Sequence, residues 1–203
     1  MNQEEALLEE QETVLQLPTG TPEQMAKALF EGQMGVTDSH MRKVLQAALS
    51  RGGDYADLYF EYAYRTSVVM EESIIKNSSI SISKGVGVRV LKGDQTGYAY
   101  SEDLSLEAMQ RAARTAASIA SSATVKEHEG YKFNRLKPSN HYPVTRTATD
   151  LPLAEKITKI QAAERAAHDF DPRIKRVTVS MVDTVDIVRI VIHDSYNIYS
   201  IHH

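Results

Sequence analysis

The chain has 203 residues, of which 42% are hydrophobic, and it carries a formal net charge of −4 with no cysteine. This apolar content can fill one good core or two small ones, whereas the acidic balance and the lack of a basic stripe argue against nucleic acid as the main partner. The chain can form no disulfide, and no apolar run approaches the roughly 20 residues that span a bilayer, so we expect no membrane association.

The amino-terminal part predicts helices. Residues 3–17 are acidic, unlike a secretory signal, and their few leucines and valines form a thin apolar stripe. Thr21–Gln24 combines a capping threonine, a proline at the first helical position and a glutamine in capping-box spacing. A further helix is expected to start at Asp38 or Ser39 and to end at Gly52–Gly53. Its apolar side should pack on a sheet.

From Tyr55 to Tyr64 the apolar period changes from the helical value to two, which predicts a strand. The tyrosines of this segment could form a platform on which bases stack. Because no basic residue is interleaved before Arg65, packing within a sheet is the favoured interpretation.

The segment after this strand predicts β-hairpins. Branched apolar residues alternate with small or polar ones and fall on one face of an extended chain. Gly85 and Gly87 are expected to bend the chain between two short strands, and Lys92–Gln95 to reverse it into Thr96–Tyr100. The alternating residues are Ile80, Ile82, Val86, Val88 and Val90.

The clearest helical pattern starts at Ser105, and its inward face is rich in alanine, which favours close approach to the sheet. Residues 124–149 are polar, contain two prolines and show no periodicity, so they predict a linker or a long surface loop. A second helix is expected over Pro152–Asp169 with Asp150 as its cap.

Two β-rich runs close the sequence, Ile174–Met181 and Val185–Ile192, and Asp183–Thr184 between them predicts a hairpin turn. Another turn signal at Asp194–Asn197 precedes a strand that starts at Ile198. Since the sequence stops at His203, we expect a second sheet that is truncated, with an open edge and little core.

These elements predict an α+β fold in which an antiparallel sheet of hairpins has helices packed on one face, followed by the start of a second α+β domain. We expect four parts: a helical extension over 1–36, a first domain over 37–123, the linker or surface loop over 124–149, and the start of a central domain over 150–203.

The order of motifs resembles the amino-terminal domain of the TldD/PmbA family, over about Thr37 to Asp194. The motifs are Asp54–Phe60 for a first strand, Ile74–Lys76 for a second, and Lys84–Arg89 followed by Thr96–Tyr100 for the hairpins.

This resemblance implies a cytoplasmic zinc metallopeptidase subunit that pairs with a related subunit, or with itself, and acts on unfolded or precursor peptides. The family's zinc ligands lie in an HExxxH helix and a later cysteine, and this sequence has neither. We therefore expect no metal bound by this chain and no activity of the chain alone.

The histidines do not form a helical metal motif, which needs two of them about one turn apart. Glu127–Glu129 contains one histidine, but the next, His141, is thirteen residues beyond His128 and across Pro138, so a solvated loop is the favoured interpretation. His202 and His203 are adjacent and point to opposite faces of an extended chain; a frayed end is favoured over adventitious metal binding.

Three further motifs have weak catalytic interpretations. Gly85–Gly87 lacks the third glycine and the following helix of a dinucleotide fingerprint. His193–Ser195 has triad residue types, but consecutive residues cannot converge on one reacting atom. The carboxylate pairs Glu71–Glu72 and Glu102–Asp103 could serve acid–base chemistry, although solvated turns are favoured.

Two functions therefore stay open. The first is the amino-terminal portion of a TldD-like peptidase subunit whose catalytic half lies outside this sequence. The second is a non-catalytic module that binds a peptide or a partner by adding a strand to an open sheet edge. The candidate contact residues for such a strand are Ile80, Ile82, Val86, Val88 and Val90.

Overall fold

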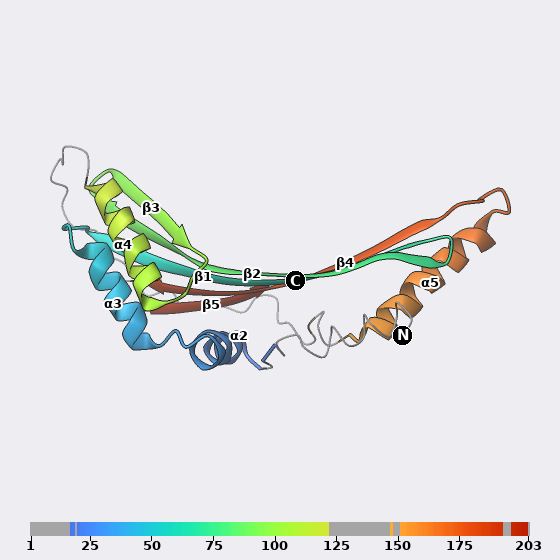
Figure 1. The fold of residues 1–203 in the computed structure, drawn as a ribbon, viewed down its shortest axis with the longest axis horizontal. Helices are drawn as coiled ribbons and strands as arrows, with labels where there is room; N and C mark the ends of the chain where they lie inside the picture. Colours follow the sequence, from blue (N-terminus) through green and yellow to red (C-terminus); the bar gives the residue numbers. More distant parts are fainter. Residues whose placement is uncertain (1–16, 19, 122–146, 148–150, 193–195, 203) are drawn as a thin grey trace.

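A computed structural model describes residues 17–18, 20–121, 147, 151–192 and 196–202 of the chain. Its strands form one antiparallel sheet of five strands in the order β3-β2-β1-β4-β5. The molecule is elongated and bowed, with α3 and α4 at one end of the sheet and α5 at the other (Figure 1). The α+β class predicted from the sequence is confirmed.

Three long strands form the body of the sheet: β1 (Tyr55–Glu71), β2 (Ile74–Lys92) and β4 (Thr178–Ile192). β1 lies between the other two and pairs with both along nearly its whole length. Two shorter strands, β3 (Gln95–Ser101) and β5 (Tyr196–His202), extend the sheet at only one end, where β3 pairs with β2 and β5 pairs with β4.

Two predicted breaks within these strands are wrong. Gly85 and Gly87 lie inside the unbroken strand β2, and the register shift of the β1–β2 ladder falls elsewhere, between Val69 and Met70. Asp183 and Thr184 make no turn, since β4 passes straight through them and pairs with β1 there. In both cases pairing with the long neighbour β1 outweighs a local turn preference. The expected second sheet is thus part of the first.

The described helices are α2 (Pro22–Lys27), the π-helical η1 (Ala28–Gln33), α3 (Asp38–Leu49), α4 (Leu106–Ala120) and α5 (Leu153–Phe170). The capping box of Thr21 and Gln24 and the Ser105 cap of α4 are confirmed. The predicted cap of α3 is wrong, because Thr37 caps this helix. The expected cap of α5, Asp150, lies outside the described residues, and the helix begins directly after Pro152. Residues 3–16, 124–146, 148–150, 193–195 and 203 lie outside the described residues.

All the described helices pack on one face of the sheet, which we call the helix face. Alternate β1 residues from Leu58 to Met70 are buried there, while Tyr59, Glu61 and Arg65 between them are exposed. The main core joins α2, η1, α3 and α4 to the sheet, with Phe30 and Phe60 in ring contact at 5.7 Å. We call the other side of the sheet the open face.

A smaller core holds α5 against the far end of the sheet, and its buried apolar residues are Val68, Met70, Leu153, Ile157 and Ile160. Beside it the buried Lys156 Nζ lies 2.9 Å from Asp183 Oδ2 and donates to Thr66 Oγ1 at 3.0 Å. This polar group ties α5 to β4 and β1 at once. After residue 150, β4 therefore belongs to the same sheet as the first part of the chain, and α5 packs on that sheet.

The tight turn between β1 and β2 is held by α5. Glu72 and Ser73 both have positive φ, 50° and 62°, a conformation that favours glycine or asparagine. The carboxylate of Glu164 accepts hydrogen bonds from the Ser73 backbone N–H at 2.6 Å and from its Oγ at 2.7 Å. The hydrogen bond from the Ser73 side chain is the main cause that lowers the pKa of Glu164 below its usual 4.5, and burial opposes it.

This contact predicts a pH dependence of stability. Because the folded pKa of Glu164 lies below the unfolded value, its ionised form stabilises the fold above that unfolded value, and the contribution is lost as the pH falls through the folded pKa. We expect the free energy of unfolding to fall more steeply below about pH 4.5 in the wild type than in Glu164→Gln. Urea titrations measure the free energy of unfolding at several pH values for the wild type, Glu164→Gln and the control Glu155→Gln, which removes an exposed carboxylate. The same dependence on pH in all three proteins would contradict the expectation.

Candidate functional site

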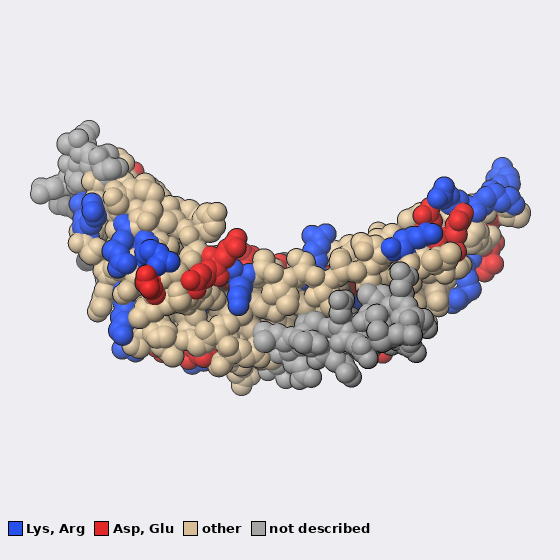
Figure 2. All heavy atoms as spheres, in the orientation of Figure 1, with Lys and Arg blue, Asp and Glu red and all other residues tan. Residues whose placement is uncertain are grey.

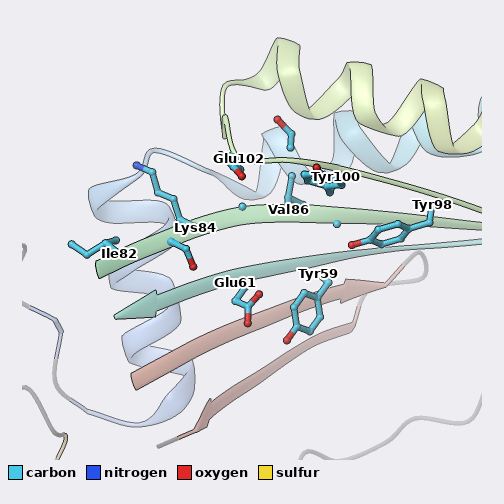
Figure 3. A pocket seen from close by; sticks show the side chains of 12 residues that line it. Tyr59, Glu61, Ile82, Lys84, Val86, Tyr98, Tyr100 and Glu102 are labelled. Carbon is cyan, nitrogen blue, oxygen red and sulfur yellow. The ribbon is translucent and has the colours of Figure 1, made fainter. Parts of the chain in front are cut away.

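A hollow of about 570 Å³ lies at the point where β3 ends beside β2 (Figure 3). We call it the first hollow. Tyr59 and Glu61 come from β1, Tyr98 and Tyr100 from β3, and Glu102 from the chain just after β3. The lining is completed by Ile82, Ser83, Lys84, Gly85, Val86, Gly87 and Ser101.

Glycines shape the floor of the first hollow. A Cβ at Gly87 would lie 2.6 Å from the hydroxyl oxygen of Tyr98, and a Cβ at Gly85 would lie 2.9 Å from the carbonyl oxygen of Ser101. Any larger residue at either position would displace the neighbour that forms the wall. The two glycines predicted to bend the chain therefore serve here to let side chain and backbone approach β2 closely.

The first hollow is aromatic and acidic. Tyr98 and Tyr100 are 57% and 71% exposed, which is high for large aromatic side chains of a sheet. Glu61 and Glu102 are exposed and add two carboxylates, against the single cation of Lys84 among the lining residues. Burial, and then the charges of Glu61 and Asp186, raise the pKa of Tyr59.

Arg89 lies near this site but its charge is already balanced. Its Nε and Nη2 both donate to Oδ2 of Asp57, at 2.9 Å and 2.5 Å, and its guanidinium lies 5.8 Å from the ring centre of Tyr55. Burial, followed by the charge of Asp57, raises the pKa of Tyr55 to about 12. The Arg89 side chain is 50% exposed, and the ion pair links β1 to β2 beside the first hollow.

A second hollow of about 490 Å³ lies next to the first, against η1 and the start of α4. Ile82 and Lys84 line both hollows, so the two flank the same stretch of β2. Tyr62 lines the second hollow and is 1% exposed, and its hydroxyl has no hydrogen-bond partner among the residues that the structure describes. The other lining residues are Gln33, Met34, Asp103, Leu104 and Ser105.

The same stretch of β2 has an open edge. β3 pairs with β2 only from Val86 to Lys92, so within the described residues no strand pairs with that side of Ile74–Gly85. Unpaired N–H and C=O groups at such an edge can bind an added strand. The edge and the two hollows meet at Ile82–Lys84.

The structure places the five contact residues predicted from the sequence at different depths. Val86, Val88 and Val90 are at most 1% exposed in the main core, and β1 and β3 flank that part of β2 on both sides. Their side chains therefore belong to the main core. Ile80 is half-buried, and Ile82, 45% exposed, is the one that faces both hollows.

Sequence reasoning missed two of the aromatic residues of the first hollow, Tyr98 and Tyr100. The signal was present, since Tyr98 and Tyr100 alternate with small residues that face the helices. Of the carboxylate pairs considered, Glu71 is ion-paired with Arg176, Asp103 accepts a hydrogen bond from the Ser105 N–H at 2.8 Å, and only Glu102 lines the first hollow. The motifs Glu127–Glu129 and His193–Ser195 lie outside the described residues.

The described residues contain no group of three or more histidine, cysteine, aspartate or glutamate side chains that could hold a metal ion. These residues therefore do not fit a peptidase metal centre. Charged side chains of both signs are scattered over the molecule and form no continuous basic stripe on the face seen in Figure 2.

Comparison with known proteins finds similarity to TldD and PmbA proteins. Residues 56–120 match the model of PmbA/TldA metallopeptidase domain 1. The chain is 33% identical over 144 residues to a metalloprotease TldD homolog of Haemophilus influenzae, a match that covers 71% of this chain and 30% of that relative. It is 28% identical over 154 residues to a metalloprotease TldD homolog of Buchnera aphidicola from Acyrthosiphon pisum, covering 74% of this chain and 31% of the relative.

Among solved structures, TldE from Thermococcus kodakarensis has a similar fold, with a TM-score of 0.54 at 13% identity. The match covers 80% of this chain and 36% of the TldE chain. The chain spans about 30% of the length of the curated relatives. Within the described part of the chain, no helix has the length and apolar character needed to cross a membrane.

Proposed function

Since the chain belongs to the TldD/PmbA family, we propose that it is the amino-terminal, non-catalytic portion of a TldD-like zinc metallopeptidase subunit that acts on unfolded or precursor peptides. The observation that carries this proposal is the open face of the sheet. The described helices all pack on the other side, and an aromatic, acidic hollow and an unpaired strand edge meet at Ile82–Lys84. An extended peptide offers the backbone groups and side chains that such a surface can bind.

In this proposal the metal chemistry belongs to sequence outside these 203 residues. The described residues contain no cluster of metal ligands. In this proposal they hold the peptide and form part of the chamber in which the full-length subunit cleaves it. We further propose that the subunit works in the cytoplasm and pairs with a related subunit of the TldE type or with a second copy of itself. The resemblance to the TldD/PmbA family, which implies a cytoplasmic subunit that works in a pair, supports these two points.

The proposal predicts that the full-length product has peptidase activity and that the isolated 203-residue chain has none. The isolated 203-residue chain is expected to bind no stoichiometric zinc and to leave unfolded casein intact, because it lacks the ligand set. The full-length product of the natural gene, with its partner subunit, is expected to cleave casein and to stop when EDTA is added. Zinc content by mass spectrometry and cleavage on gels measure both. Chelator-sensitive cleavage by the isolated chain, or none by the full-length product, would contradict the proposal.

A second candidate function is a non-catalytic binding module that adds a peptide or partner strand to its sheet. The open edge of β2 over Ile74–Gly85 favours it. The casein experiment separates the two, since a binding module retains peptide affinity while the full-length product shows no chelator-sensitive cleavage.

A further inference from the structure

The open edge of β2 and the two hollows lie so that one added strand would use all three. β3 stops opposite Val86, and the unpaired stretch of β2 that follows contains Ile82 and Lys84, which line both hollows. A strand added there would take the place that β3 would occupy if it were longer. Side chains of a strand point alternately to the two faces, so consecutive residues would reach different hollows.

The chemistry of the first hollow fits a positively charged side chain. Its walls are the rings of Tyr59, Tyr98 and Tyr100, whose faces attract cations. The carboxylates of Glu61 and Glu102 give it more negative than positive charge, since Lys84 is the only cation among its lining residues. Asp186 on the open face adds a further negative charge close to Tyr59.

The second hollow offers a different contact. The Tyr62 hydroxyl is buried without a hydrogen-bond partner among the described residues, an arrangement that costs free energy until a partner binds. Asp103 and Ser105 at its rim are polar as well. A side chain that can hydrogen-bond, placed next to the basic residue of the peptide, would satisfy the Tyr62 hydroxyl.

From this arrangement we propose that an extended peptide binds as an added strand along Ile80–Lys84 of β2, with a lysine or arginine in the first hollow and a neighbouring polar side chain in the second. This inference rests on the proposed function, and it names the class of substrate: unfolded segments that carry a basic residue. The peptide backbone supplies affinity through the edge of β2, and the two hollows supply selectivity.

The first test compares probe peptides by fluorescence anisotropy with the isolated chain. The probe is a fluorescein-labelled Ser/Thr/Val peptide with one central lysine, and its match has glutamate instead. We expect the lysine peptide to bind about tenfold more tightly, the effect of one charge-assisted hydrogen bond. Glu61→Gln should remove most of this preference, whereas Glu107→Gln, which removes the same charge from the outer side of α4, should not. Equal binding of both peptides would overturn the inference.

Two further measurements separate this site from a general loss of structure. Tyr62→Phe should weaken binding several-fold while leaving the urea midpoint equal or higher, because it removes an unpartnered buried hydroxyl. A peptide N-methylated at one set of alternate residues should lose binding, and one methylated at the other set should keep it. If both methylated peptides bind like the parent, strand addition is excluded, even where the full-length product still cleaves casein and the proposed function stands.

Discussion

An Arg189→Met variant is expected to lose about 3 kcal/mol of its free energy of unfolding. Arg189 of β4 is fully buried on the helix face, where its guanidinium donates to Glu31 at 2.5 Å and to Asp38 at 3.0 Å. These carboxylates belong to η1 and to the first turn of α3, so one side chain fastens two amino-terminal helices to the sheet. Methionine fills a similar volume but leaves both carboxylates without this cation.

The matched control is Arg111→Met. Arg111 forms an ion pair with Glu107 at 2.7 Å, between the two Arg189 distances, but both side chains lie on the exposed side of α4. An exposed pair of this spacing contributes only about 0.5 kcal/mol. Urea unfolding of both variants tests the difference, and equal losses would show that burial of Arg189 contributes nothing beyond an ordinary surface pair.

Replacing Gly97 with alanine is expected to cost about 3 kcal/mol, at the upper end of the range for overpacking. Gly97 lies on the helix face of β3, and a Cβ added there would lie 1.9 Å from the carbonyl oxygen of Ala116 and 2.7 Å from the backbone nitrogen of Ala120. Both are backbone atoms of α4, so no side-chain rotation can relieve the clash. The helix itself must move away from the sheet, which opens the main core.

Gly32→Ala is the control for this substitution. Gly32 lies in η1, has no positive φ, and a Cβ there would meet nothing within 4 Å. Alanine at this exposed helical position should leave stability unchanged or raise it by up to about 1 kcal/mol. If Gly97→Ala unfolds at the same urea concentration as Gly32→Ala, then α4 does not approach β3 as closely as the structure has it.

Local sequence patterns were sufficient to predict most of the helices, strands and turns. The Thr21 capping box, the Ser105 cap and the turn at Lys92–Gln95 each involve residues only a few positions apart, so sequence spacing specifies them. The apolar alternation of Ile80 to Val90 likewise predicted which face of β2 is covered by helices. It could not predict how far the strand runs, because that depends on pairing with β1, whose residues lie far away in sequence.

The candidate site was harder to foresee for the same reason. Tyr59 and Tyr98 come from different strands, and they meet only because β2 lies between β1 and β3 in a particular register. Val86, Val88 and Val90 looked equivalent to Ile82 in the sequence, yet β3 and the helices cover them and leave Ile82 exposed. Burial therefore differs among the residues of a single alternating pattern.

The sequence by itself determined the class of fold, the Thr21 and Ser105 caps and the one-sided patterning of the sheet, since propensity and period act between near neighbours. Only the tertiary structure decided that β4 joins the sheet beside β1, that Arg189 and Lys156 are buried with acidic partners, and that β3 ends early enough to expose an edge of β2. Each of these depends on which distant segments pack together, and the free energy of that packing is a property of the assembled sheet and helices.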